Sequence, residues 1–357
     1  MAKHLLHNKY SREDLRKMLE QESDHRTVIS FYQYAKIEDP LAFRNEMYAR
    51  WEKLGVLGRV YVAKEGVNGQ ISLPTHNYYD FKDDLYKVDF LNGIRLNVAV
   101  EQKDDAFFKL KVKVREKIVA DGLDDSTFDV TNKGKHLSAQ EFNELTNKPE
   151  TILIDMRNHY ESEVGHMKGA YCPDVDTFRE ELPLVVDKFK EDKDKHVVMY
   201  CTGGIRCEKA SAYLKHVGFE NVYQLNGGII EYTRQCNEEG IENKFVGKNF
   251  VFDERLGERI SDEVIAECHQ CGKPCDDHTN CANDACHLLF IQCDECKEKY
   301  QGCCSTECTD FIQLPEEKQK ELRKGMKAQV HHYKKGRVRP KLKELLIDKL
   351  AEANTNL

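Results

Sequence analysis

Short apolar segments alternate with longer amphipathic ones between residues 151 and 225, and this alternation constrains the fold more than any other feature. We predict strands at 151–156, 196–201 and 222–225, and helices at about 176–190 and 206–216. Strands that are apolar throughout are buried on both faces, as in parallel sheets whose connecting helices cover both sides. The sequence therefore predicts a parallel α/β domain over residues 136–245.

The strand at 196–201 ends at Cys201, which would lie at the carboxyl edge of the sheet, where open α/β folds bind ligands. The segment that leads into the next helix consists of Thr202, Gly203, Gly204, Ile205 and Arg206. Its two glycines allow backbone N–H groups to point inward, and the helix dipole and the arginine add positive charge. These effects favour a thiolate. We therefore expect Cys201 to be a nucleophile or to carry a persulfide; the alternative is a buried cysteine beside an ordinary glycine turn.

The six residues from Cys201 to Arg206 resemble the active loop of the rhodanese superfamily. Other features of that superfamily occur in the same order, namely Asp155-Met156-Arg157, Glu161, the segment 165–170 and the segment 225–228. The related phosphatase loops have one more residue between cysteine and arginine, so the length found here favours sulfur chemistry. The resemblance covers about residues 137–240 and implies a rhodanese domain.

Four further residues of this domain are candidates for supporting the loop. Asp155 and Arg157 are interpreted as a structural ion pair that braces the loop. His166 is expected to pack against the loop, with proton transfer as the alternative role. Cys207 either resolves an oxidised or persulfidated Cys201 or, as we favour, faces away from it at the start of the helix.

Residues 1–135 carry strand and helix patterns in the order strand, helix, strand, strand, helix, strand. The strands are predicted at 27–36, 59–64, 70–73 and 94–100, and the helices at 41–54 and 75–86. This order is typical of a ferredoxin-like (acylphosphatase-like) domain. Asn68-Gly69, between the second and third strands, is predicted to form a hairpin turn. An additional role would bring Lys64 and Asn68 to an RNA phosphate or base near the reactive cysteine.

Ten of the fourteen cysteines fall between residues 268 and 308, within a segment at 246–312. Two C-x-x-C pairs, Cys268 with Cys271 and Cys293 with Cys296, are the usual provision for a tetrahedral zinc ion. A second ion could use four of the remaining cysteines and histidines, and the sequence does not select them. The alternatives are disulfide-linked or redox-active thiols and an iron–sulfur cluster.

The chain ends in a basic tail at 313–357, although the formal net charge of the whole chain is −8. Between Lys318 and Lys343 there are eleven Lys and Arg residues and one acidic residue. The net charge argues against a globally basic nucleic-acid-binding protein, whereas the tail can neutralise phosphates. We assign RNA contacts to Lys334, Lys335, Arg337 and Arg339. The alternative is a solvated helix followed by a disordered end.

The three parts together resemble the rhodanese-domain tRNA uridine hydroxylases, which form 5-hydroxyuridine at the wobble position using oxygen. The resemblance implies an oxidoreductase with Cys201 as the catalytic thiol, supported by Arg206, with molecular oxygen as co-substrate and a tRNA anticodon loop as partner. The sequence carries no nicotinamide or flavin fingerprint. Two alternatives remain open: a sulfurtransferase with a persulfide on Cys201, and an RNA-binding module without catalysis.

The sequence also bears on where the protein works. No stretch approaches 18 apolar residues, and the first fifteen residues lack the long apolar segment of a signal peptide. A chain with this many cysteines and no such signal is expected to stay in a reducing compartment. We therefore expect a cytosolic protein that does not enter a membrane; its oligomeric state is left open.

Overall fold

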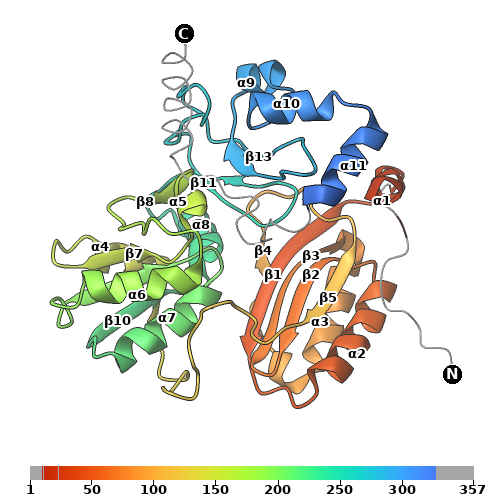
Figure 1. Ribbon diagram of the computed structural model, residues 1–357. Coiled ribbons are helices and arrows are strands. Elements are labelled where there is room, and N and C mark those ends of the chain that lie inside the picture. Colours follow the sequence, from red (N-terminus) through yellow and green to blue (C-terminus); the bar gives the residue numbers. More distant parts are fainter. Residues whose placement is uncertain (1–9, 11, 23, 327–357) are drawn as a thin grey trace, which may run out of the picture.

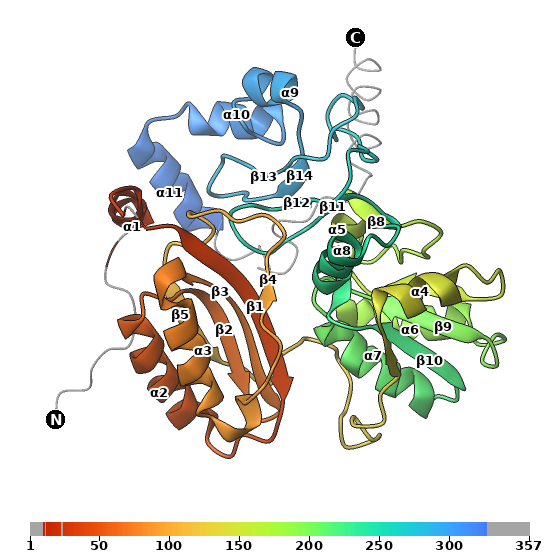
Figure 2. The same ribbon diagram turned by 180° about the vertical axis from the view of Figure 1, so that it is seen from behind.

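Figures 1 and 2 show the computed structural model, which describes residue 10, residues 12–22 and residues 24–326. The N-terminal part and the central part lie side by side, and the C-terminal part lies above them in both views. The four tail residues to which we assigned RNA contacts, Lys334, Lys335, Arg337 and Arg339, lie outside the described residues.

The N-terminal domain confirms the predicted order of strands and helices. Its elements are α1 (Arg12–Glu20), β1 (Arg26–Tyr34), α2 (Pro40–Lys53), β2 (Leu57–Ala63), β3 (Gly66–Pro74), α3 (Tyr78–Tyr86), β4 (Asn97–Val98) and β5 (Leu110–Val114). The sheet has the order β4-β1-β3-β2-β5, in which β1 to β4 pair antiparallel and β5 runs parallel to β2. The first four strands thus form the ferredoxin-like arrangement, and α2 and α3 cover one face of the sheet (Figure 1).

The two faces of this sheet differ in chemistry because side chains alternate along each strand. On one face, Phe31 and Val60 pack with Trp51 of α2 and Phe81 of α3 in a single apolar core. The opposite face carries polar and aromatic side chains, namely Ser30, Tyr32, Arg59, Tyr61, Asn68 and Gln70, and all of them line a cavity shared with the central domain. The sheet therefore presents a polar face to its neighbour.

The predicted hairpin turn at Asn68-Gly69 is wrong. The turn consists of Lys64 and Glu65, because Ala63 pairs with the first residue of β3, and both residues of the Asn-Gly pair lie within that strand. A Cβ atom on Gly69 would come within 2.6 Å of the Phe31 ring, so the glycine permits close packing across the sheet. The Nδ2 of Asn68 donates a hydrogen bond to the Ile118 carbonyl at 3.2 Å. This pair serves packing and the cavity instead of a turn.

The central domain confirms the predicted parallel α/β fold. Its elements are β6 (Lys135–Leu137), α4 (Ala139–Thr146), β7 (Ile152–Asp155), α5 (His159–Ser162), β8 (Gly165–Met167), α6 (Phe178–Lys188), β9 (His196–Tyr200), α7 (Ile205–His216), β10 (Asn221–Leu225) and α8 (Gly228–Glu239). The strands β6, β10, β9 and β7 pair parallel in that order. Two apolar cores cover the two faces: one includes Leu182 of α6 and Leu214 of α7, and the other includes Phe142 of α4 and Tyr232 of α8.

The C-terminal part has little regular structure. Its elements are β11 (Phe245–Asn249), β12 (Glu258–Arg259), β13 (His278–Asn280), β14 (Leu289–Ile291), α9 (Asp294–Lys299), α10 (Thr306–Ile312) and α11 (Glu316–Met326). β11 pairs antiparallel with β8 and so attaches this part to the central domain. A small apolar cluster joins Tyr160 and Val164 to Phe250, Cys268 and Cys296. The C-terminal part therefore packs directly on α5 and the start of β8.

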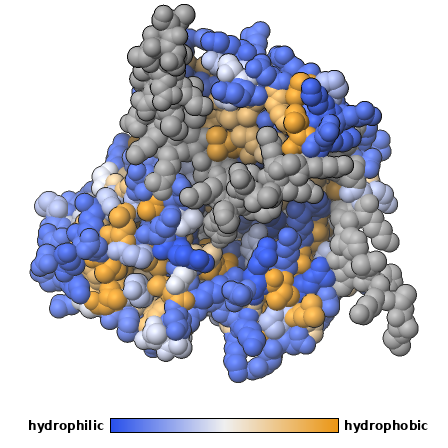
Figure 3. All heavy atoms as spheres, viewed as in Figure 1, coloured by the Kyte–Doolittle hydropathy of each residue, from blue (hydrophilic) through white to orange (hydrophobic). Residues whose placement is uncertain are grey.

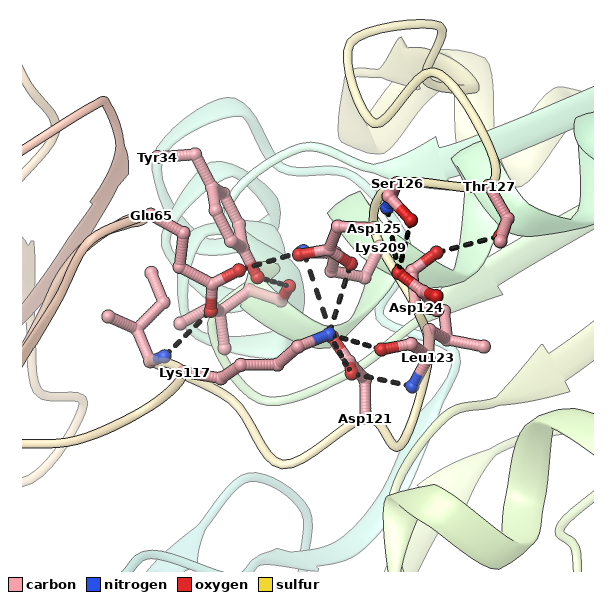
Figure 4. A network of polar contacts seen from close by, with 12 residues as sticks. Tyr34, Glu65, Lys117, Asp121, Leu123, Asp124, Asp125, Ser126, Thr127 and Lys209 are labelled. Atoms are coloured by element: carbon pink, nitrogen blue, oxygen red, sulfur yellow. Dashed lines mark hydrogen bonds and ion pairs between the residues drawn. The ribbon is translucent and has the colours of Figure 1, made fainter.

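A buried network of charges joins the N-terminal domain, the linker and α7 (Figure 4). Lys209 of α7 is almost fully buried, lies 2.8 Å from the carboxylate of Glu65 and pairs with Asp125. Lys117 contacts Asp121 at 2.7 Å and Asp125 at 3.0 Å. Because a buried charge is tolerated only when it is paired, these contacts fix the turn between β2 and β3 against α7.

The surface shown in Figure 3 is mainly hydrophilic, with hydrophobic residues in separate groups among the polar ones. Within the described residues, no helix combines the length and the apolar character that a membrane span requires.

Candidate active site

The loop after β9 surrounds the sulfur of Cys201 with hydrogen-bond donors, as predicted. The backbone N–H of Gly204 donates to the Cys201 Sγ at 3.1 Å. Gly204 is the N-cap of α7 and has a φ of +100°, which residues with a side chain rarely adopt. A Cβ atom there would also come within 2.9 Å of the Tyr32 Oη. The predicted glycine requirement is therefore both conformational and steric.

The charge state of Cys201 follows from two opposing effects. Burial would raise its pKa, but a hydrogen bond from Cys207, the charge of Arg206 and the backbone N–H groups of both residues outweigh that effect and lower the pKa to about 6. Cys201 is therefore a thiolate near neutral pH. The predicted role of Arg206 as the nearby cation is consistent with this balance.

The expectation that Cys207 faces away from Cys201 is wrong. Both side chains are fully buried in the same apolar core, and the thiol of Cys207 is hydrogen bonded to Cys201. Burial and this hydrogen bond raise the pKa of Cys207 well above its usual value, so it stays protonated and donates. The first turn of α7 packs inward at this position, which brings the second thiol against the first.

Arg206 is held by a partner that the sequence analysis had noted only as a family feature. Its Nη1 and Nη2 donate to the two carboxylate oxygens of Glu161 at 2.6 and 2.9 Å. Glu161 is fully buried and belongs to α5, so the arginine is clamped between two helices. A bidentate pair of this kind fixes the direction of the guanidinium as well as its charge.

The predicted ion pair of Asp155 and Arg157 is confirmed. The Nε and Nη2 of Arg157 donate to the two oxygens of the Asp155 carboxylate at 2.9 and 2.7 Å, and both side chains are fully buried. His166 lies on β8 with its Nδ1 3.0 Å from the Ser162 carbonyl, which attaches it to the end of α5. Arg157 also donates to the Gly165 carbonyl of β8, so the ion pair holds the start of that strand, whereas His166 holds the helix that carries Glu161.

Glu181 is a buried acid that the sequence analysis missed. It lies on α6, is fully buried, and neither carboxylate oxygen has a hydrogen-bond partner among the described residues. Burial raises its pKa well above the usual value, although the nearby charge of Arg206 acts in the opposite direction. A carboxyl group that stays neutral beside a thiolate and an arginine is a candidate proton donor. No sequence motif marks it, since its partners are distant in the chain.

A cavity of about 670 Å³ opens beside the loop, between the N-terminal and central domains. Cys201, Thr202 and Gly203 line it from one side, and the polar face of the N-terminal sheet lines it from the other. The Cys201 side chain is fully buried, at 0% exposure, and Cys201 is one of the residues that line this cavity. The volume lies within the range of ligand sites for small molecules.

Three buried polar atoms of residues that line the cavity have no hydrogen-bond partner among the described residues. They are the Oδ1 atoms of Asn97 and Asn158 and the Oγ1 of Thr202. Buried polar groups are almost always paired with protein or with ordered water, so these atoms can each bind water or a polar ligand. Of the two residues in the N-terminal domain proposed to contact RNA, Asn68 lines the cavity, whereas Lys64 lies in the turn between β2 and β3 outside it.

The C-terminal part gathers eight of its cysteines into two groups of four. In the first quartet, Cys268, Cys271, Cys293 and Cys296, the sulfur atoms all lie within 4.8 Å of one another, as the two C-x-x-C pairs predicted. The second quartet, Cys281, Cys286, Cys304 and Cys308, meets the same limit. All fourteen cysteines are free in this structure. Each quartet can hold a metal ion.

Three family models match successive parts of the chain. The UPF0176 acylphosphatase like domain matches residues 26–118, the rhodanese-like domain matches residues 138–235, and the rhodanase C-terminal domain matches residues 246–309. These matches confirm the predicted fold class of each part.

Relatives of known name match over nearly the whole chain. The tRNA uridine(34) hydroxylase of Photorhabdus laumondii is 54% identical over 94% of this chain and 96% of its own length. The protein of the same name from Yersinia pestis is 56% identical over 90% of this chain and 91% of its own. Among solved structures, the rhodanese-like domain of the Alr3790 protein from Anabaena matches with a TM-score of 0.25 and 21% identity, over 31% of this chain and 78% of that one.

Proposed function

Because this chain belongs to the tRNA uridine(34) hydroxylase family, we propose that it converts the wobble uridine of tRNA to 5-hydroxyuridine with Cys201 as the essential thiol. The observation that carries the proposal is that Cys201, whose pKa is lowered to about 6, belongs to the lining of a cavity with many polar residues. The enzyme is then an oxidoreductase that uses molecular oxygen, and its tRNA substrate places it in the cytoplasm.

The polar lining of the cavity suits a uracil ring. Uracil offers an N3–H donor between two carbonyl acceptors, and the polar side chains of Asn68, Gln70 and Asn97 belong to residues that line the cavity and can pair with both kinds of group. The Tyr61 residue also lines the cavity, and its ring offers a surface for base stacking. Bases of an anticodon loop can enter such a cavity without the opening of a duplex.

The thiolate supports two routes to the C5 carbon. In the first, the Cys201 sulfur bonds to C6 of the uracil ring, electron density moves to C5, and C5 attacks oxygen. Loss of the C5 proton and of the thiolate then restores the ring. One oxygen atom enters the product and the other leaves as water, with two electrons from an external reductant. In the second route, the thiolate takes one oxygen atom of O2 to form an S–O bond, while the other oxygen leaves as water with two electrons from the external reductant. C5 then bonds to the oxygen on sulfur, the S–O bond breaks to return the thiolate, and the C5 proton is lost.

Nucleoside analysis of tRNA from cells that lack this protein tests the proposal. Mass spectrometry should show loss of 5-hydroxyuridine, and its return when the intact gene is supplied. Loss of a thiolated nucleoside instead would support the sulfurtransferase alternative, in which Cys201 carries a persulfide. Unchanged levels of every modified nucleoside would support a protein that only binds RNA.

The first quartet also has a proposed occupant. Four thiolates from two C-x-x-C pairs are the preferred ligands of a structural zinc ion, which we assign to Cys268, Cys271, Cys293 and Cys296. The ion would contribute folding energy to the C-terminal part and would take no part in the reaction. Three cysteines of this quartet belong to the apolar cluster that includes Tyr160 of α5, so zinc here would support the helix that holds Arg206 through Glu161.

A further inference from the structure

The second quartet lies away from the C-x-x-C pairs, and no motif spacing indicates it. Its ligands come from two segments, Cys281 and Cys286 in one and Cys304 and Cys308 in the other. We propose that these four cysteines bind a second structural zinc ion, so that the C-terminal part holds two separate tetrahedral sites. This inference does not depend on the proposed hydroxylase activity.

The distances between the sulfur atoms fit a single tetrahedral ion. The Sγ of Cys304 lies 3.7 Å from that of Cys286 and 3.8 Å from that of Cys308. Four sulfurs at about 2.3 Å from one zinc ion are separated by about 3.8 Å along each edge of the tetrahedron. A disulfide would require about 2.05 Å. An iron–sulfur cluster would place several iron and sulfide atoms between the cysteines and hold their sulfurs further apart.

The surroundings of the quartet match those of the first one. In the first quartet, the backbone N–H of Cys293 donates to the Cys268 Sγ at 3.4 Å. In the second, the backbone N–H of Cys304 donates to the Cys281 Sγ at the same distance of 3.4 Å. The side-chain amide of Asn283 also donates to the Cys308 Sγ at 3.3 Å. Such donors orient thiolate ligands and partly neutralise their charge.

The packing around the quartet explains why an ion is needed. The local apolar cluster has four buried members, and three of them are cysteines, with Phe290 as the fourth. This is too little apolar surface to offset the entropy of ordering the segment that joins the two pairs of ligands. Small segments with such cores are folded by metal binding. Cysteine side chains, two of them from the quartet, therefore take the place that large apolar side chains fill elsewhere in the molecule.

Metal analysis of the full-length protein tests this proposal. Native mass spectrometry and elemental analysis, under reducing conditions, should find two zinc ions per chain and no iron. The double variant Cys286→Ser, Cys308→Ser should hold one zinc ion. A matched control, Cys275→Ser, removes a buried cysteine of the same part that belongs to neither quartet, and should keep two.

A measurement on the unaltered protein covers the case in which the double variant does not fold. The protein is titrated with a mercurial reagent that modifies thiols, and a zinc indicator reports the metal released. Modification of the eight quartet thiols should release two zinc ions per chain. One zinc ion in the unaltered protein, iron in place of zinc, a disulfide in the intact mass, or two ions retained by the double variant would each overturn the proposal.

Discussion

The cysteine of the active loop and the cysteines of the two quartets differ in their surroundings, and this difference suits the first to reaction and the others to metal binding. Cys201 has N–H donors and an arginine around it and a single neighbouring thiol, Cys207, that stays protonated. Each quartet sulfur instead lies within 4.8 Å of three others. A lone thiolate in a ring of donors is available to react, whereas four close thiols are suited to share one metal ion.

The supports of the two regions differ as well. The loop is held by ion pairs that come from distant parts of the central domain, above all the pair of Arg206 with Glu161. The segment around the second quartet has few buried apolar residues and depends on its sulfur atoms. The loop should therefore lose stability when a charge is removed, and the C-terminal part should unfold when a metal ligand is removed.

The largest effect is expected from removal of two ligands of the first quartet. Cys268→Ser combined with Cys296→Ser should unfold much of residues 246–312, because the metal supplies most of the folding energy there. Limited proteolysis should cut this region rapidly while the central parallel sheet, with its own two cores, stays protected. Equal protection of the C-terminal part in the variant and the wild type would contradict the assignment.

Next in size is the loss of the charge that holds Arg206. Glu161→Gln leaves a buried guanidinium without its ionic partner, which should lower the free energy of unfolding by about 3–5 kcal/mol. Denaturant titration measures this change. The control Asp192→Asn removes a surface pair with Lys195 and should cost at most ~1 kcal/mol. Similar costs for the two variants would show that the loop is not held by charge.

The thiolate of Cys201 makes stability depend on pH in a defined direction. Its pKa in the folded protein is about 6, below the value of about 8.5 for an unperturbed cysteine. The folded chain thus binds fewer protons between these values, so the stabilisation is complete above about pH 8.5 and is lost as the pH falls towards 6. As the pH rises from about 6 to about 8.5, the free energy of unfolding of the wild type should therefore increase relative to that of Cys201→Ala, by about 1.4 kcal/mol per pH unit.

The control for this pH series is another buried cysteine of the same domain. Burial raises the pKa of Cys236, so the stability difference between wild type and Cys236→Ala should stay constant below about pH 8. Denaturant titrations at several pH values compare the two variants. Parallel, pH-independent differences for both would show that Cys201 is not an anion in the folded protein.

The smallest effect is expected at Glu181. Its buried carboxyl group favours the neutral form, so Glu181→Gln replaces one neutral polar group with another of the same shape. The free energy of unfolding should change by less than about 1 kcal/mol. A loss of several kcal/mol, measured by denaturant titration, would mean that the carboxylate is charged and paired with Arg206 in the folded protein.

The sequence could predict those structural features that depend on residues close together in the chain. The alternation of strands and helices predicted the central sheet, and the residues from Cys201 to Gly204 predicted the ring of N–H donors. In each case the residues that interact lie within one or two turns of chain, so their spacing carries the structural information.

The parts that the sequence could not predict depend on contacts between distant segments. Arg206 and Glu161 are 45 residues apart in the sequence, and Glu181 is buried by elements from across the central domain. The Asn68-Gly69 pair has the composition of a turn, but the register of β3 with its neighbours places it within a strand. The choice of the second quartet among the remaining cysteines likewise required the folded chain.

The central claim is that the sulfur of Cys201 is the group that the enzyme reacts through, and one measurement tests it most directly. Cells that lack the protein are supplied with Cys201→Ser or, as a matched control, Cys236→Ser, and their tRNA is analysed for 5-hydroxyuridine by mass spectrometry. With both variants folded and equally abundant, the first should restore none of the modification and the second should restore it fully. Normal 5-hydroxyuridine with Cys201→Ser would contradict the account.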